Sequence, residues 1–392
     1  MQKSANLTVL LCALLIFISL NVNSQNVVND KFGKGITAIA KDSSFQMKFG
    51  FRFQTLYTGE HDVASGEWSE SLMVRRYRLK FDGWAFSPKV QYKMELGLSN
   101  RDTQGGRIDQ SGNTASIVLD AVVKWNFAPG WQLWFGQTKL PGNRERVISS
   151  QNLQFVDRSL VNSRFTLDRD IGVQLRHKST VGRMVLRQSV AISTGEGRGI
   201  IVGNPDHGRQ YTARVEILPF GAFTSKGDYF GSDLKREASP KLAIGVTGDY
   251  NNNTVRSRGN LGSFVTDDAG EYIYSDFQTV FVDGIFKYKG FSAASEYVYR
   301  TASTKINSFG YGSGVTGSAG YLFMNNIEIA TRYTHIEPIS VLSSIDTIDE
   351  YMVGFSKYVV GHNLKIQSDF AYVNIHNKEK FYRFRLQCEL AL

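Results

Sequence analysis

Cysteine and proline are scarce in this chain, whose 392 residues include two cysteines and seven prolines. Cys12 falls in an apolar stretch near the N-terminus, and loss of that stretch during export would leave only Cys388. One cysteine cannot form an intrachain disulfide. An exported form of this protein must therefore gain its stability in another way.

Long hydrophobic runs are also few. The one extended apolar stretch, Leu7 to Leu20, follows Lys3, and it is shorter than the roughly 20 apolar residues that a membrane-spanning helix needs. Val22-Asn23-Ser24 offers a cleavable end to this stretch. We therefore predict a secretory signal peptide over residues 1–24 and no transmembrane helix after it.

Acidic residues are fewer than basic ones, which gives a formal net charge of +9. Such an excess is typical of proteins that bind nucleic acid or an acidic surface, and of pores whose lumen favours anions. Export argues against nucleic acid as a partner. The other two interpretations stay open on charge alone.

The chain is rich in segments in which apolar and polar residues strictly alternate. A period of two residues is typical of a β-strand with one apolar and one polar face. Residues 45–54 alternate phenylalanine or methionine with polar residues or glycine, and residues 382–392 alternate apolar residues with Arg383, Arg385 and Glu389 among others. About sixteen such segments begin near residues 45, 72, 90, 117, 131, 170, 184, 211, 241, 275, 291, 314, 326, 349, 363 and 381.

An all-β fold explains these observations best: a transmembrane antiparallel β-barrel of about 16 strands over residues 45–392, in a bacterial outer membrane. Residues 25–44 would form a periplasmic N-terminal segment, and outer-membrane lipid would surround the barrel. Aromatic residues fall where the strand ends should meet the membrane interfaces. They are Trp84, Phe86, Trp125, Phe127, Trp131, Tyr288, Phe291 and Tyr358.

The connections alternate in predicted length, as in bacterial barrels with short periplasmic turns and long outer loops. The long ones are predicted at 59–71, 101–116, 140–169, 195–210, 252–274, 301–313, 337–348 and 373–380. One connection breaks the rule, because 219–240 should be a short turn and is long. An extra local hairpin within it is one explanation.

The third long connection, 140–169, is the first candidate site. Its apolar residues are numerous enough to pack against a wall, so we predict that it folds into the lumen and places charges at a constriction. The alternative is a solvated surface loop. The basic residues it would place there are Arg144, Arg146, Arg158, Arg164 and Arg169.

The second predicted strand carries the other candidate. Since Tyr77 and its alternating neighbours face lipid, Arg76, Arg78 and Lys80 must point inward, because lipid-facing charges at mid-depth cost roughly 2–4 kcal/mol each. The same alternation places Arg52 inside. Carboxylates are predicted inside too, so a salt-bridge lattice that stiffens the wall is the alternative for any one residue. Arg75 has the lipid-facing parity and is expected to reach the headgroups.

Enzyme motifs are nearly absent, so we predict no catalytic residue, no metal and no cofactor. The leading hypothesis is passive diffusion of small anions, with phosphate as one candidate, through a water-filled lumen. A barrel that conducts poorly and serves as an assembly or secretion partner is an alternative. An outer-membrane hydrolase, with its site assembled across strands near His177, His335 or His362, is another.

The sequence also resembles the phosphate-selective porin O and P family. The resemblance implies a sixteen-stranded trimeric barrel with an inward third loop that passes anions, and in some members phosphate. It spans nearly the whole mature chain. It is carried, in family order, by Arg75–Gly83 (RRYRLKFDG), Phe135–Pro141 (FGQTKLP), Phe155–Val161 (FVDRSLV), Arg169–Leu175 (RDIGVQL), Glu296–Arg300 (EYVYR) and Gly361–Lys365 (GHNLK).

Overall fold

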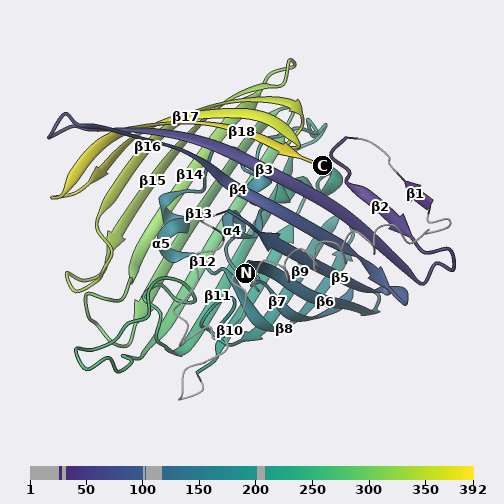
Figure 1. The fold of residues 1–392 in the computed structure, drawn as a ribbon, viewed down its shortest axis with the longest axis horizontal. Coiled ribbons are helices and arrows are strands. Elements are labelled where there is room, and N and C mark those ends of the chain that lie inside the picture. The colour runs from purple at the N-terminus through teal and green to yellow at the C-terminus, as the bar shows by residue number, and fades with distance from the viewer. Residues whose placement is uncertain (1–25, 29–31, 100–101, 103–116, 201–207) are drawn as a thin grey trace, which may run out of the picture.

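Long antiparallel strands make up most of the protein (Figure 1). The computed structural model describes residues 26–28, 32–99, 102, 117–200 and 208–392. The predicted signal peptide lies outside the described residues. The short helices are α4 (Arg144–Val147) and α5 (Leu160–Phe165), with 3₁₀ turns η1 (Ser150–Asn152) and η2 (Thr224–Tyr229). The strands are β1 (Asn26–Val28), β2 (Ile36–Ile39), β3 (Phe45–Asp62), β4 (Trp68–Ala85), β5 (Ser87–Gly97), β6 (Val118–Ala128), β7 (Trp131–Lys139), β8 (Arg169–Val181), β9 (Met184–Ser193), β10 (Gln210–Leu218), β11 (Lys241–Thr254), β12 (Ser275–Tyr288), β13 (Phe291–Ala302), β14 (Gly312–Leu322), β15 (Ile327–Pro338), β16 (Ile348–Val360), β17 (Leu364–Ile375) and β18 (Glu379–Ala391).

Sixteen of these strands, β3 to β18, form one closed ring. Each pairs antiparallel with the next along the chain, and β18 pairs with β3 from Phe381↔Asp62 to Ala391↔Arg52. The predicted count of sixteen is confirmed, and every strand begins within four residues of its predicted start. Closure leaves no open sheet edge in the ring, which a β-structure in lipid requires.

The N-terminal strands lie outside this ring. β2 pairs with the first part of β3, and β1 pairs with β2. Figure 1 shows both strands beside one end of the barrel rather than within its wall. Among the described residues, no helix is long and apolar enough to cross a membrane.

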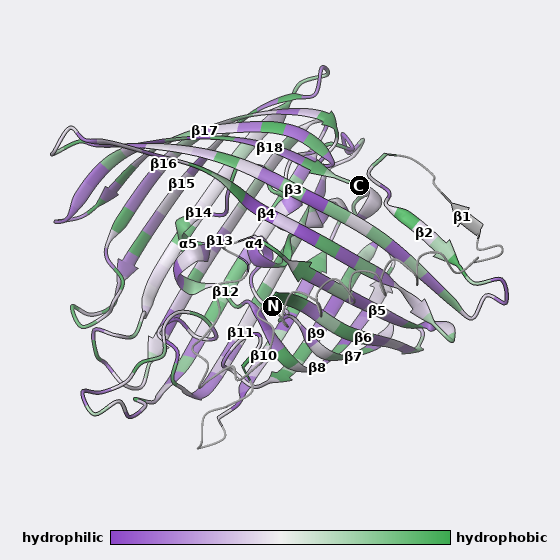
Figure 2. Cartoon of the chain, viewed as in Figure 1, coloured by the Kyte–Doolittle hydropathy of each residue, from purple (hydrophilic) through white to green (hydrophobic). Residues whose placement is uncertain are grey.

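Each strand has an apolar and a polar face, as the alternation predicts. In β16, Tyr351 and Phe355 are about half exposed on the outside of the ring. Glu350 and Ser356, of the opposite parity, are buried on the inside. Figure 2 shows this alternation of hydrophobic and hydrophilic residues along many strands. A ring with an apolar outside and a polar inside is matched to a surrounding membrane.

Two predicted long loops are short in the structure. β3 and β4 have 18 residues each, so the connection predicted at 59–71 is reduced to residues 63–67. The connection predicted at 373–380 is reduced to residues 376–378. Polar residues at these strand ends continue the antiparallel hydrogen bonding beyond the apolar band. The alternation of apolar and polar residues reflects contact with lipid, so it does not show where a strand ends outside the membrane.

The long connection 219–240 contains no extra hairpin, so that interpretation was wrong. It contains η2 and folds toward the inner face of the ring. The Nζ of Lys287 on β12 donates to the carbonyls of Gly227 and Phe230, both at 2.9 Å. Asp228 is fully buried and pairs with Arg187 on β9. The segment is long because its carbonyl and carboxylate groups bind lysine and arginine side chains on the inner face of the barrel.

Arg75 does not reach toward lipid as its parity suggested. Gln54 pairs with Arg76 and Thr55 with Val74, so Arg75 is the extra residue of a β-bulge in β4. A bulge shifts the alternation of side chains along a strand. Arg75 and Arg76 consequently both reach Asp157, at the inner face of the ring.

The predicted interfacial aromatics mostly face outward. Trp125 and Phe127 are 50% and 40% exposed, and Phe291 is 39% exposed. Tyr358 is an exception: it is 1% exposed, and its hydroxyl donates to Glu328 at 2.7 Å. Tyr358 has the same parity as Glu350 and Ser356, so the alternation of β16 already points its side chain into the ring.

Candidate functional site: a basic passage along one side of the barrel

The third loop, which we define as residues 140–168 between β7 and β8, packs against side chains that point into the ring. Val161 and Phe165 of α5 are fully buried in an apolar cluster with Phe281 of β12 and Val298 of β13. The burial of such side chains stabilises the packed loop by roughly 1.5–3 kcal/mol each. The many apolar residues of this loop are thereby accounted for.

Polar contacts hold the same loop to distant strands. The Nε2 of Gln154 donates to Ser292 on β13 at 3.0 Å and to Glu328 on β15 at 2.8 Å. Arg52 on β3 donates to Ser150. The loop also meets the connection 219–240, since the Gly231 N–H donates to the carbonyl of Asn152 at 2.6 Å.

Two adjoining cavities lie between this loop and the wall on the β4 to β10 side. The loop-side cavity, of about 320 Å³, lies between the third loop and strands β4 to β8. The turn-side cavity, of about 590 Å³, lies between the loop, the turn at 128–130 and the connection 219–240. Both are lined by Trp134, Val147 and Arg176, so they meet at these residues.

The lining of the loop-side cavity is strongly basic. Of its eighteen residues ten are arginine or lysine and two are carboxylates, Glu95 and Asp120. Like charges lining a low-dielectric wall raise the local concentration of counter-ions. The ten cationic residues are Arg75, Arg76, Arg78, Lys93, Lys124, Lys139, Arg146, Arg158, Arg169 and Arg176.

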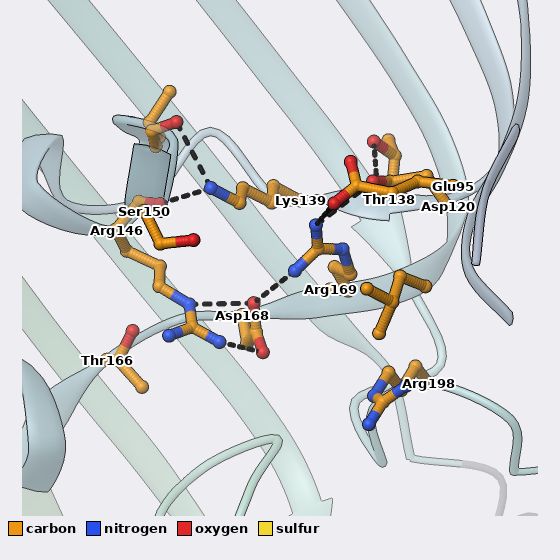
Figure 3. A network of polar contacts seen from close by, with 12 residues as sticks. Glu95, Asp120, Thr138, Lys139, Arg146, Ser150, Thr166, Asp168, Arg169 and Arg198 are labelled. Atoms are coloured by element: carbon orange, nitrogen blue, oxygen red, sulfur yellow. Dashed lines mark hydrogen bonds and ion pairs between the residues drawn. The ribbon is translucent and has the colours of Figure 1, made fainter. Parts of the chain in front are cut away.

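Figure 3 shows how a chain of carboxylates neutralises part of this lining. Arg169 lies 3.0 Å from Asp120 and 3.7 Å from Asp168. Asp168 also pairs with Arg146. Burial alone would raise the pKa of Asp168, but the guanidinium groups of Arg146 and Arg169 lower it well below its ordinary value. Asp168 therefore stays ionised and joins the loop to β8.

The ladder predicted on the second strand is paired as well. Arg76 lies 3.3 Å from Asp157 of the third loop. Arg78 lies 3.0 Å from Glu95 and 2.7 Å from Asp102. The two remaining pairs are Arg52–Glu389 at 2.9 Å and Lys80–Asp82 at 2.8 Å.

The arginines predicted on the third loop have different surroundings. Arg144 is buried and binds Glu216 and Asp283 at 3.0 and 2.7 Å, so it fastens the loop to β10 and β12. Arg158 donates to the carbonyls of Glu145 and Ile148. Arg164 is partly buried on α5, and the described residues give it no ion pair.

Four of the ten cations that line the loop-side cavity have no carboxylate within ion-pair distance among the described residues. Arg158 is one of them, and the other three are Lys139, Lys124 and Arg176. Lys139 donates from Nζ to the carbonyls of Arg146, Val147 and Ile148 at 2.6–3.3 Å. Lys124 and Arg176 lie over the ring of Trp134.

The alternation along β6 and β8 gives Lys124 and Arg176 the inward parity, but the candidate residues named from the sequence include neither of them, nor Lys139. Lys124 lies between the apolar residues Val123 and Trp125, and the one acidic residue of the same strand, Asp120, is four positions away. This isolation from acidic residues is a signal that could have made Lys124 a candidate site residue. Lys139 lies where β7 ends, and no pattern in the sequence tells which way its side chain turns.

The described residues show no assembled hydrolase site. The His177 ring nitrogen contacts Gln188, and that of His335 contacts Asp349. His362 contacts the Gly231 carbonyl and Lys365. None of these hydrogen bonds reaches a serine hydroxyl. No group of three or more His, Cys, Asp or Glu among the described residues is arranged to hold a metal ion.

A closed ring of sixteen antiparallel strands, apolar outside and charged inside, defines an outer-membrane β-barrel of the porin type. The chain belongs to the phosphate-selective porin O and P family, whose model matches residues 47–380. The resemblance seen in the sequence is thereby confirmed.

Solved porins share the fold at low sequence identity. A loop-deletion form of OmpT of Vibrio cholerae is 11% identical, covers 89% of this chain and 100% of its own, and superposes with a TM-score of 0.56. An anion-selective porin of Comamonas acidovorans is 9% identical over 89% of this chain and 100% of its own, with a TM-score of 0.53.

A trimer form of OmpT of Vibrio cholerae is 10% identical over 88% of this chain and 99% of its own, with a TM-score of 0.52. No curated protein sequence matches the chain.

Proposed function

We propose that this porin lets small anions diffuse passively through the passage formed by the loop-side and turn-side cavities. The observation that carries the proposal is the lining of the loop-side cavity, with ten cationic residues against two carboxylates. Diffusion through such a passage needs neither a cofactor nor covalent chemistry.

The route follows one side of the barrel. The third loop covers the opposite wall, where α5 lies against β13, β14 and β15. We therefore propose that the third loop narrows the lumen and leaves the open route beside β4 to β10. Ions that pass must meet Trp134 and Arg176, where the two cavities join.

Phosphate is a candidate solute, because family membership favours it and phosphate is recognised by guanidinium and ammonium groups. The paired state of Arg52, Arg76 and Arg78 bears on this proposal. Each spends part of its hydrogen-bonding capacity on a carboxylate, so phosphate would compete with a fixed partner. We propose general anion preference as the primary property and phosphate binding as a separate one.

We also propose that residues 1–24 are cleaved on export and that the barrel works as a homotrimer in the outer membrane. The apolar stretch Leu7 to Leu20 supports the first proposal. The trimer form of a structurally similar porin supports the second. Cross-linking of the purified barrel before and after heating would separate a trimer from a monomer.

A reversal potential across a planar bilayer in a KCl gradient tests the function. We expect a potential of the sign given by chloride permeating faster than potassium. Potassium preference would refute the anion pore. The absence of conductance from folded barrels would favour the alternative of a non-conducting assembly partner. Adding phosphate to chloride then tests binding, since a phosphate site lowers the chloride current at low phosphate concentration.

A further inference from the structure

One tryptophan on the passage wall lies between two cations. Trp134 is on β7, with its neighbours Lys124 on β6 and Arg176 on β8. The Nζ of Lys124 lies 4.1 Å from the centroid of the indole, and the guanidinium carbon of Arg176 lies 3.9 Å from it. A cation about 4 Å from a ring centroid lies over a face of the ring, and two like charges that come from the strands on either side of β7 are kept apart by taking opposite faces.

The ring is held in place by its own hydrogen bonds. Trp134 Nε1 donates to Gln132 at 3.0 Å, and Gln132 in turn donates to Asn126 at 2.6 Å. Arg176 donates to the side-chain carbonyl of Gln174. The indole and the guanidinium are thus set before any solute arrives, which lowers the ordering cost of binding.

The two positive charges are not neutralised. Within the described residues, neither Lys124 nor Arg176 has a carboxylate at ion-pair distance. A cation over an aromatic face keeps its charge and gains about 0.5–2 kcal/mol. Trp134 and Arg176 line both cavities, and Lys124 lines the loop-side one. The stack therefore lies where the two cavities adjoin.

The spacing of the charges selects the shape of the anion. Two charged groups 4.1 and 3.9 Å from one centroid, on opposite faces, are separated by the thickness of the indole and by at most about 8 Å. Charge-assisted hydrogen bonds are about 2.7–2.9 Å long, and the indole fills the space between the charged groups. The oxygens of a single tetrahedral anion lie too close together to reach both cations around the ring edge.

We propose that Lys124, Trp134 and Arg176 form a subsite for elongated dianions, whose two acidic groups are joined by a short spacer. The occupant is a dicarboxylate, whose two carboxylates are separated by methylene groups. The proposal rests on the proposed function, because it assumes that anions traverse the passage. It goes beyond that function in naming a solute class that is not phosphate.

The test is the block of chloride current by two dianions of equal charge, glutarate and sulfate, in planar bilayers at neutral pH. We expect half-block by glutarate at a concentration about tenfold lower than by sulfate, because only glutarate engages both cations. Pyrophosphate is a parallel arm, and block by pyrophosphate at a lower concentration than by glutarate would contradict a dicarboxylate subsite. Equal block by glutarate and sulfate would overturn the proposal.

Trp134→Leu removes the ring without changing any charge. We expect it to abolish the preference for glutarate while the reversal potential in a KCl gradient stays anionic, and Trp134→Phe to give an intermediate preference. Unchanged preference in Trp134→Leu would refute the role of the indole. Heat-modifiable migration on gels checks that each variant has a folded barrel.

Lys124→Gln and Arg176→Gln should each remove the glutarate preference, and the double variant should add little, because bridging needs both ends. Lys178→Gln is the matched control, since Lys178 lines the turn-side cavity and the cations over the Trp134 ring among the described residues are Lys124 and Arg176. An equal loss in Lys178→Gln would mean that only bulk charge matters, which contradicts the subsite. A wild-type channel without anion preference would instead overturn the proposed function.

Discussion

Replacing Arg144 with methionine should loosen the third loop from the barrel wall. The side chain is 3% exposed, and it binds Glu216 of β10 at 3.0 Å and Asp283 of β12 at 2.7 Å. Removing one partner of a buried ion pair costs about 3–5 kcal/mol, mostly because the other charge is left unpaired. Here both carboxylates keep Arg214, at 2.8 and 2.6 Å. We therefore expect a cost near the lower end, about 3 kcal/mol.

That cost falls on the attachment of the loop rather than on the ring of strands, because the barrel ladder does not pass through Arg144. Single-channel recordings should show Arg144→Met with a larger and noisier conductance than wild type, while its heat-modifiable migration stays that of a folded barrel. Arg164→Met is the control, since Arg164 lies on the same loop without an ion pair among the described residues. If both variants conduct alike, the anchoring argument is refuted.

Two further perturbations test the charges of the passage and of an outer loop. Arg76→Ala combined with Arg78→Ala leaves Asp157 and Glu95 short of a partner each, so the reversal potential should move toward cation preference by a measurable shift; an unchanged potential would show that the pair only stiffens the wall. In the connection between β9 and β10, burial raises the pKa of the Glu196 carboxyl to about 7. A raised acid pKa gives stability that is full below about pH 4.5 and is lost as pH rises to 7, by about 3 kcal/mol in all. Glu196→Gln should therefore melt higher than wild type at pH 8 and little differently at pH 4.5, and equal melting at both pH values would contradict this.

The fold could be predicted because lipid outside and water inside impose the same two-residue period on every strand. Sixteen strands and their order follow from that period. Most of the errors fall where the period is not enforced by lipid. Arg75 is shifted by a bulge. Tyr358 was assigned to the membrane interface by its place near a strand end, whereas its parity within β16 is inward. The connection 219–240 is governed by buried polar contacts of its own, such as Asp228 with Arg187.

The ion pairs in the lumen could not be predicted from the sequence, because the two residues of a pair are often far apart along the chain. They come together only when the barrel closes. Arg52 finds Glu389, which is 337 residues away, only because β18 returns to β3. The alternation shows which cations point inward but not which are neutralised.

We propose that the pairing of a lumen cation with a carboxylate decides whether that cation can bind a passing anion. Paired arginines such as Arg78 fix the geometry of the wall and the loop. Lys124 and Arg176, which lie over an indole and have no carboxylate at ion-pair distance among the described residues, are cations that a passing solute could meet unpaired. Most of the arginines named from the sequence, such as Arg76, Arg78 and Arg144, are paired with carboxylates. We propose that Lys124 and Arg176 beside Trp134 are among the cations that an anion would meet unpaired.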